Sequence, residues 1–358
     1  LALGATEIPL VLQDRDFDAQ GRLRYAPSRD DLFAGFIGPR LFVNLTEQPV
    51  VQATRRVYRF RILNGSNART YRLAFLQDGR RLGYYLIGTD GGLLAAPERV
   101  DQTYVSPGQR LDVLLDLREA KDGRPVTLGT LAFDPMHAEG PGGHGTGGAS
   151  TAGVDHAAMG HGAAAASGEA GQAGIEGEPR ALLRLDVKAD VKPSTRYTKK
   201  VPARLSTLPA AKAPHGAPRP IKLAHDGKGQ WTINGWTYDA NAVPLTVKRG
   251  AVETWLLEND RRSMPHPMHI HGFQFRVIER RNSPTQVRAL SGIGGLLPQD
   301  RGLLDTVHVW PGESVHIVLD FTHAYAGDQD YVFHCHNLEH EEAGMMIRYR
   351  VQGAASPS

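Results

Sequence analysis

Cysteine is almost absent from this chain of 358 residues, because Cys335 is the only one. An internal disulfide is therefore impossible, and the cysteine count carries no information about the redox compartment. Long apolar runs are also missing, since no stretch approaches the roughly 18 residues of a membrane-spanning helix. The first twelve residues lack the basic and long apolar regions of a secretory signal, and the chain starts without methionine. We expect a processed or partial polypeptide without a membrane span.

An excess of one charge is lacking as well. The chain has 41 basic and 38 acidic residues, a net charge of +3 and a pI of about 8.9. The basic residues form no stripe along the sequence, so nucleic acid is not an expected partner. The length is sufficient for two domains of ordinary size.

The lone cysteine lies in a stretch rich in metal-binding side chains. Residues 331–345 read Tyr-Val-Phe-His-Cys-His-Asn-Leu-Glu-His-Glu-Glu-Ala-Gly-Met. Residues 330–336 are predicted to form a strand, on which successive side chains point to opposite faces. Cys335 then faces one way, and His334 and His336 face the other. One strand can therefore reach two metal sites that are joined through the backbone of the cysteine.

A second motif upstream divides in the same way. Residues 266–272 read His-Pro-Met-His-Ile-His-Gly, in which the last two histidines share a face if the segment is extended. A trigonal set of two histidines and one cysteine with a weak axial methionine is typical of electron-transfer copper, whereas zinc prefers four closed nitrogen or sulfur ligands. We therefore predict a mononuclear copper site and half of a polynuclear one. The residues are His266, Cys335, His340 and Met345 for the first, and His269, His271, His334 and His336 for the second.

The rest of the chain is predicted to be all-β. Short β-rich runs are separated by turn signals, which is typical of a β-sandwich, and one of them, Arg56–Leu63, alternates basic and apolar residues for most of its length. Residues 57–64 match residues 252–259, and residues 106–116 match residues 310–320. The sequence therefore contains two copies of one β fold. Only the second copy carries the metal-ligating residues, so the first is interpreted as a spacer.

An insertion rich in Gly and Ala interrupts the first copy at residues 134–179. It contains too little apolar surface to bury a core, so we expect it to be flexible. One interpretation is a solvated loop, which costs little closure entropy. The other is a weak copper-scavenging loop, because imidazole and thioether groups bind copper. Its candidate ligands are Met136, His137, His144, His156, Met159 and His161.

Both metal motifs resemble the carboxy-terminal signatures of the multicopper oxidases, the family of laccases and cuprous oxidases. His-Pro-x-His-x-His-Gly and His-Cys-His-x₃-His-x₄-Met are both complete. The resemblance covers nearly the whole chain outside the insertion, and it implies the second and third domains of a three-domain enzyme, both Greek-key β-sandwiches of the cupredoxin type. The implied parts are a copper-free domain at residues 1–198, which contains the insertion, a linker at 199–229 and a copper-binding domain at 230–358.

The resemblance also implies a role for each ligand. The type 1 copper would take His266, Cys335, His340 and Met345, the type 2 copper would take His269, and the type 3 pair would take His271, His334 and His336. Glu341 matches an acidic position of the family, so we expect it to relay protons to the oxygen-reducing cluster. The alternative for Glu341 is a solvated side chain in an acidic run. Asp305, in an Asp-Thr-Val segment, is interpreted as structural, and Met264 is expected to pack in the core or, alternatively, to touch substrate or Cu(I).

The implied activity is that of a laccase-like oxidase. One-electron oxidation of phenols or similar donors, at the edge of His266 or His340, would be coupled to four-electron reduction of O₂ to water. A complete cluster in this family takes eight histidines, four of them from an amino-terminal domain with paired His-x-His motifs. No such motif precedes His269 here. We therefore expect that cupredoxin domain on the same precursor or on another chain.

Two other functions stay open at this point. The histidines and methionines of the insertion favour a cuprous oxidase for copper tolerance, with Cu(I) as the donor. The half-complete oxygen site favours an electron-transfer or copper-binding module without catalysis. The family resemblance further implies a periplasmic or secreted location.

Overall fold

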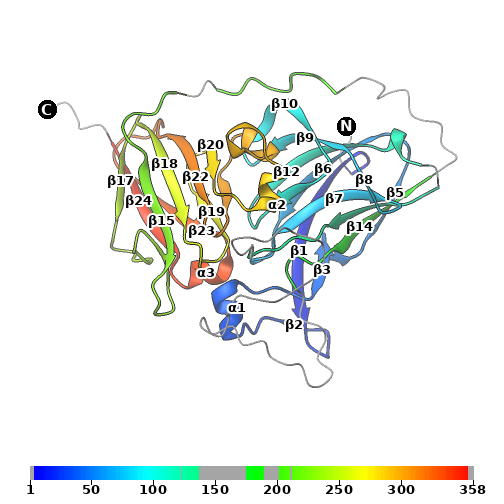
Figure 1. The fold of residues 1–358 in the computed structure, drawn as a ribbon, viewed down its shortest axis with the longest axis horizontal. Coiled ribbons are helices and arrows are strands. Elements are labelled where there is room, and N and C mark those ends of the chain that lie inside the picture. The colour runs from blue at the N-terminus through cyan, green and yellow to red at the C-terminus, as the bar shows by residue number, and fades with distance from the viewer. Residues whose placement is uncertain (1–3, 122, 137–174, 189–200, 210–211, 354–358) are drawn as a thin grey trace.

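The structure is a computed structural model that describes residues 4–121, 123–136, 175–188, 201–209 and 212–353. The described chain consists mainly of β-strands in four sheets, with short helices in the connections (Figure 1). The sheets form two sandwiches, each around its own apolar core. The prediction of an all-β fold is confirmed.

The first sandwich contains two sheets packed face to face. One has the order β10-β9-β12-β6-β1-β3-β4, with β2 paired to β1, and the other has the order β11-β7-β13-β14-β5, with β8 paired to β7. Side chains from both sheets, such as Phe60 and Phe75, meet in the core. The elements are β1 (Glu7–Phe17), β2 (Leu23–Arg24), α1 (Arg29–Ala34), β3 (Arg40–Val43), β4 (Thr46–Glu47), β5 (Val50–Ala53), β6 (Val57–Asn64), β7 (Tyr71–Gln77), β8 (Arg80–Leu82), β9 (Tyr84–Thr89), β10 (Gly92–Val100), β11 (Thr103–Val105), β12 (Arg110–Asp116), η1 (Leu117–Glu119), β13 (Val126–Thr130) and β14 (Arg180–Val187).

The second sandwich repeats this plan with two five-stranded sheets. Their orders are β16-β15-β18-β22-β20 and β17-β24-β23-β19-β21. Trp255 and Phe333 come from opposite sheets and are fully buried against each other. The elements are β15 (Arg219–His225), β16 (Trp231–Ile233), β17 (Leu245–Lys248), β18 (Val252–Asn259), β19 (His266–Ile270), β20 (Phe275–Arg281), α2 (Thr285–Arg288), η4 (Ile293–Gly295), η5 (Pro298–Arg301), β21 (Thr306–Val309), β22 (Ser314–Asp320), β23 (Gln329–Cys335), α3 (Leu338–Glu342) and β24 (Met346–Gln352).

The internal repeat is visible in the strand register. In the first sandwich, β6 pairs antiparallel with β12 so that Val57 lies opposite Asp116. In the second, β18 pairs with β22 so that Val252 lies opposite Asp320. These pairs are the matched positions of the two sequence repeats, so the two copies fold with the same pairing.

The predicted linker needs a correction. Residues 199–229 are predicted to be a linker, but β15 lies within them and pairs in parallel with β18. Along β15 the side chains of Ile221 and Leu223 are buried, whereas that of Lys222 is exposed. Prolines and lysines around this short pattern hide it in the sequence, and pairing inside the sheet decides the conformation. The second sandwich therefore begins before residue 230.

The predicted insertion at residues 134–179 lies outside the described residues except at its two ends. Those ends meet next to β13 and β14, where the backbone N–H of Phe133 donates to the carbonyl of Gly177 at 3.0 Å. Within the described ranges, no helix is both long enough and apolar enough to cross a membrane.

Candidate metal centres

Strand pairing brings the two histidine motifs together in the second sandwich. β19 pairs antiparallel with β23, so that His269 lies opposite His334 and Met268 lies opposite Cys335. Because side chains alternate along a strand, the cysteine points into the sandwich core, while His334 points toward His269 and His271. The alternation expected from the sequence therefore produces two adjacent ligand sets.

The first set is a buried triangle of two imidazoles and one thiol. The Nδ1 atoms of His266 and His340 lie 3.1 Å apart, and Cys335 Sγ lies 3.6 Å and 3.7 Å from them. All three residues are fully buried. These separations are those of three atoms that share one ion at about 2 Å.

Hydrogen bonds on the far sides of the imidazoles leave both Nδ1 atoms directed at the thiol. His340 Nε2 lies 2.8 Å from the backbone carbonyl of Phe33, and His266 Nε2 lies 2.8 Å from the hydroxyl of Ser263. A carbonyl only accepts, so Nε2 of His340 carries the proton and its Nδ1 is free for a metal. Burial lowers the pKa of His340 to about 3 and, together with neighbouring histidines, lowers the pKa of His266 well below its ordinary value.

The sulfur is enclosed in the same way. Burial raises the pKa of the Cys335 thiol, and the backbone N–H of Asn337, 3.4 Å from the sulfur, acts against that rise. Met345 is fully buried, and its backbone carbonyl accepts a hydrogen bond from the Cys335 N–H at 3.0 Å. The methionine therefore lies beside the triangle in the same core. Two imidazoles, a thiolate and a thioether are the donor set that suits copper, so these residues fit that metal.

The second set is a cluster of imidazoles at the edge of the sheet. His269, His271 and His334 place one ring nitrogen each within 4.8 Å of one another, and the Nε2 atoms of His271 and His334 lie 3.1 Å apart. The ring of His336 lies 5.6 Å, centre to centre, from those of His269 and His334. Burial and the neighbouring histidines lower the pKa of His271 to about 4, so its ring is neutral and able to ligate at physiological pH. His271 is also exposed, so the set opens at the surface.

One close approach from the first sandwich supports this cluster. Gly108, at a positive φ of 79°, lies against the His336 ring, where an added Cβ would come within 2.4 Å of Cδ2. Only glycine fits that contact.

Asp305 and Thr306 hold His269 in place, which the sequence interpretation did not anticipate. His269 Nδ1 lies 2.9 Å from the Asp305 carbonyl and 2.9 Å from the Thr306 hydroxyl. The carbonyl requires Nδ1 to carry the proton, so Nε2 is free for a metal. Arg110 of the first sandwich holds the Asp305 carboxylate with two hydrogen bonds of 2.6 and 2.8 Å. The Asp-Thr-Val sequence at residues 305–307 was the signal that could have indicated this contact. Interpreting Asp305 only as structural missed its position next to His269, a proposed ligand.

The two carboxyl groups at this contact, those of Asp90 and Asp305, differ in pKa. Burial raises the pKa of Asp90 to about 6 although Arg110 opposes the rise. Burial also acts to raise the pKa of Asp305, but hydrogen bonds with His269 and Arg110 hold that pKa below its usual range. Asp305 therefore keeps its charge beside His269 to a lower pH than Asp90 does.

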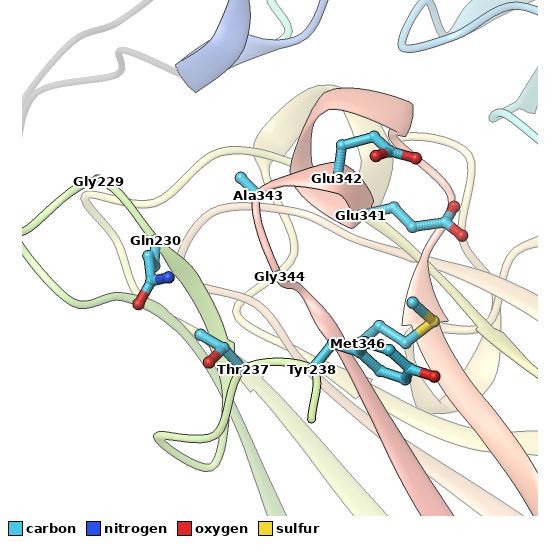
Figure 2. A pocket seen from close by; sticks show the side chains of 9 residues that line it. All are labelled: Gly229, Gln230, Thr237, Tyr238, Glu341, Glu342, Ala343, Gly344 and Met346. Atoms are coloured by element: carbon cyan, nitrogen blue, oxygen red, sulfur yellow. The ribbon is translucent and has the colours of Figure 1, made fainter. Parts of the chain in front are cut away.

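Glu341 lies between the cluster and the surface. Its Oε2 is 3.2 Å from His334 Nδ1, and its side chain is 27% exposed. Burial acts to raise the pKa of Glu341, but the hydrogen bond with His334 and the other imidazoles lower it overall. Glu341 also lines a pocket of about 440 Å³ together with Glu342, Tyr238 and Met346 (Figure 2). The expected proton-relay residue therefore connects a cluster histidine with a solvent-accessible pocket.

Two further expectations can be compared with the structure. Met264 is 8% exposed and belongs to the core of the second sandwich, so the packing interpretation of that residue describes its position. An electron donor was predicted to contact His266 or His340. In this structure both imidazoles are fully buried, so neither presents an exposed edge to a donor.

Comparisons with known proteins agree with this fold and this site. A family model described as multicopper oxidase matches residues 212–354. The structure is similar to that of the McoA multicopper oxidase from Aquifex aeolicus, with a TM-score of 0.79 and 34% identity over 99% of this chain and 67% of that one. The chain is 30% identical to a laccase of Bacillus stratosphericus, over 95% of this chain and 62% of the laccase. It is also 31% identical to the cell division protein FtsP of Photorhabdus laumondii, over 86% of this chain and 53% of FtsP.

The chain belongs to the multicopper oxidase family, and its sandwiches have the cupredoxin fold predicted from the sequence. Membership in this family implies copper as the metal. The chain spans about half to three fifths of the length of the curated relatives it matches.

Proposed function

We propose that this chain contributes the electron-accepting site and half of the oxygen-reducing site of a laccase-like oxidase. The observation that carries the proposal is the position of Cys335. Its thiol belongs to the buried triangle, while His334 and His336 on either side of it belong to the imidazole cluster. Copper, when bound, supplies one-electron redox chemistry at the triangle and the reduction of O₂ at the cluster.

Each residue has a proposed role in that reaction. His266, Cys335, His340 and Met345 would hold the type 1 copper, His269 the type 2 copper, and His271, His334 and His336 the type 3 pair. Asp305 and Thr306 fix the tautomer of His269. Reduction of O₂ to two waters consumes one proton for every electron, and Glu341 is the group that takes protons from the pocket and holds them beside His334.

The exposed imidazole cluster needs further ligands. We propose that an amino-terminal cupredoxin domain, on the same precursor or on another chain, supplies the other histidines and covers His271. The coverage of the relatives supports this proposal, because each extends well beyond the part that the chain matches. We also propose a periplasmic or secreted location, as expected from the family.

A specific observation favours a second candidate, a cuprous oxidase. Both imidazoles of the triangle are fully buried, so a bulky phenol cannot touch either of them in this structure, whereas a small donor such as Cu(I) needs less room. A copper-binding module without catalysis is the third candidate. In its favour, three relatives are named for cell division rather than for an oxidation.

Two measurements test the proposal together: spectroscopy of the copper-loaded chain, and O₂ uptake of the copper-loaded protein that includes the proposed amino-terminal domain. We expect an intense blue thiolate absorption that Cys335→Ser abolishes, and O₂ consumption of one molecule for every four electrons that the donor loses. Blue absorption in the Cys335→Ser protein would refute the site. A blue protein with its full complement of copper that consumes no O₂ with phenols or Cu(I) would instead establish the module without catalysis.

A further inference from the structure

Residues 25–38 of the first sandwich, here called the strap, reach across to the second sandwich. The strap contains α1 and connects β2 to β3. α1 lies beside α3, the helix that carries His340 (Figure 1). A segment far away in the sequence therefore lies directly over the triangle of His266, Cys335 and His340.

Three hydrogen bonds fasten the strap at this place. The carbonyl of Phe33 accepts from His340 Nε2 at 2.8 Å. The next carbonyl along the chain, that of Ala34, accepts from the Asn337 amide at 3.2 Å. The hydroxyl of Tyr25 donates to the buried carboxylate of Glu339 at 2.9 Å. The strap therefore occupies the outer edge of His340 with its own backbone.

Aromatic rings complete the cover. The ring of Phe33 lies 5.0 Å from that of buried Trp231, and Trp231 lies 4.5 Å from the ring of His340 and 4.9 Å from that of His266. The ring of His225 packs against both Phe33, at 5.1 Å, and Trp231, at 4.9 Å. These rings fill the space in which a planar aromatic molecule would have to lie to touch either imidazole.

The close approach of the strap depends on its own local structure. Ser28 and Asp31 form a capping box that fixes the start of α1. Gly35, at the end of α1, has a φ of +107°, and an added Cβ would lie 2.3 Å from Ala68 Cβ and 2.5 Å from Asn337 Nδ2. A side chain at residue 35 would therefore force the strap away from α3.

We propose that the strap, through Phe33, determines which electron donors the type 1 site accepts. It excludes bulky aromatic donors from contact with His340 and leaves access to small donors, or to donors that react across the Phe33–His340 hydrogen bond. In each case the donor loses one electron and the type 1 site gains it. The inference rests on the proposed copper site, but the cover itself is a property of the protein alone.

Chemical modification of the metal-free protein tests the cover without any copper. Diethyl pyrocarbonate acylates accessible neutral imidazoles, and peptide mass spectrometry locates the products. We expect His340 to react at least about tenfold more slowly than the exposed His215. In Gly35→Val, which displaces the strap, and in Phe33→Ala, which removes the ring, His340 should become more reactive. Leu32→Ala is the matched control, because Leu32 lies on the exposed side of the same helix.

Donor selection is tested in the copper-loaded protein under anaerobic conditions, where bleaching of the blue absorption follows reduction. For Gly35→Val and Phe33→Ala we expect the rate with a bulky phenolic dye to rise by about tenfold, while the rate with Cu(I) changes much less. Circular dichroism checks that both variants remain folded. The two variants test the strap independently, because Gly35→Val displaces it and Phe33→Ala removes only a ring.

Two results would overturn the inference. One is a wild-type His340 that reacts as fast as His215. The other is an unchanged ratio of phenolic to Cu(I) rates in a variant whose His340 has become reactive. If none of the proteins turns blue with copper, the proposed copper site is wrong, and the modification experiment still decides whether the strap covers His340.

Discussion

The two sandwiches share one strand register, yet metal-ligating groups of three or more residues occur, among the described residues, only in the second. His266 begins β19 and lies opposite Val309. Tyr71 begins β7 and lies opposite Val105 at the matching position of the first sandwich. Tyr71 is fully buried and bonds through its hydroxyl to Ser66 at 2.9 Å. A packed phenol therefore takes the place of the His266 imidazole, which is a proposed copper ligand.

The neighbouring strand shows the same replacement. In the second sandwich, Cys335 of β23 lies opposite Met268 of β19. At the matching position of the first sandwich, Thr130 of β13 lies opposite Leu73 of β7. The Thr130 hydroxyl accepts a hydrogen bond from the Arg72 backbone N–H at 3.0 Å, so it supports the pairing of β13 with β7. The scaffold is the same in both copies, and the chemistry depends on single side chains placed on it.

The connection after that strand separates the two copies most clearly. In the second sandwich, residues 336–345 connect β23 to β24 and supply His336, His340 and Met345. In the first sandwich, the equivalent connection between β13 and β14 holds the insertion. A short, well-packed connection places ligands, whereas the long one adds sequence at a position where the fold tolerates it.

The largest expected effect comes from substituting Cys335 of β23, with Thr130 at the matching position of β13 as the comparison. Cys335→Ser should abolish the blue absorption completely, because a hydroxyl does not replace the thiolate. Thr130→Ser, at the matching position, keeps the hydroxyl that accepts from Arg72 and should leave the absorption unchanged. Absorption spectra at equal copper loading measure both. Loss of colour in Thr130→Ser would show that the two sandwiches are not independent in this respect.

A smaller effect is expected at the imidazole cluster. Thr306→Val removes the hydroxyl that lies 2.9 Å from His269 Nδ1 while the Asp305 carbonyl remains. Loss of such a supporting partner lowers metal affinity by about 10–100-fold. Equilibrium dialysis should show weaker copper binding at the cluster, with the blue absorption intact. Thr306→Ser keeps the hydroxyl and is the control, so a similar loss in that variant would point to packing instead.

Copper binding at the triangle should release roughly one proton at pH 7. Burial raises the pKa of the Cys335 thiol, which must lose its proton to bind metal, whereas His340, with a pKa of about 3, is already neutral. Titration calorimetry of copper into the metal-free protein, in buffers of different ionisation enthalpy, counts the protons. A release close to zero would mean that the thiol is already ionised.

The lowered pKa of His340 predicts how the stability of the metal-free protein changes in acid. The unfolded chain binds a proton at His340 below the ordinary pKa of 6.5, and the folded chain does so only below about 3. The unfolded state therefore binds more protons between these values, and the free energy of unfolding falls as the pH falls from 6.5 to 3. Urea unfolding across that range should show this fall, and His340→Gln should reduce it. An equal pH dependence in His340→Gln would assign the effect to other groups.

Sequence reasoning predicted the fold and the meeting of both ligand sets because alternation along a strand is a local rule. His334 and Cys335 are neighbours, so their opposite directions follow from backbone geometry alone. The contacts that come from the other sandwich did not follow from it. Nothing in the sequence around Phe33 indicates that its carbonyl lies on His340, and Arg110 shows no local sign of its bond to Asp305. Such contacts depend on how the two sandwiches pack, which no periodicity encodes.

The smallest expected effect returns to the first matched pair. Tyr71→Phe removes a hydroxyl that bonds to buried Ser66, and the loss of one such bond costs about 1 kcal/mol of stability. The blue absorption should be unchanged, because residue 71 lies in the sandwich that holds none of the proposed ligands. His266→Phe, at the matching position, should remove the colour while the fold persists, since an aromatic ring at this register position already packs well in the first sandwich. Urea unfolding of both variants and their absorption spectra separate the two outcomes. A loss of colour in Tyr71→Phe would mean that the first sandwich controls the copper site through more than support.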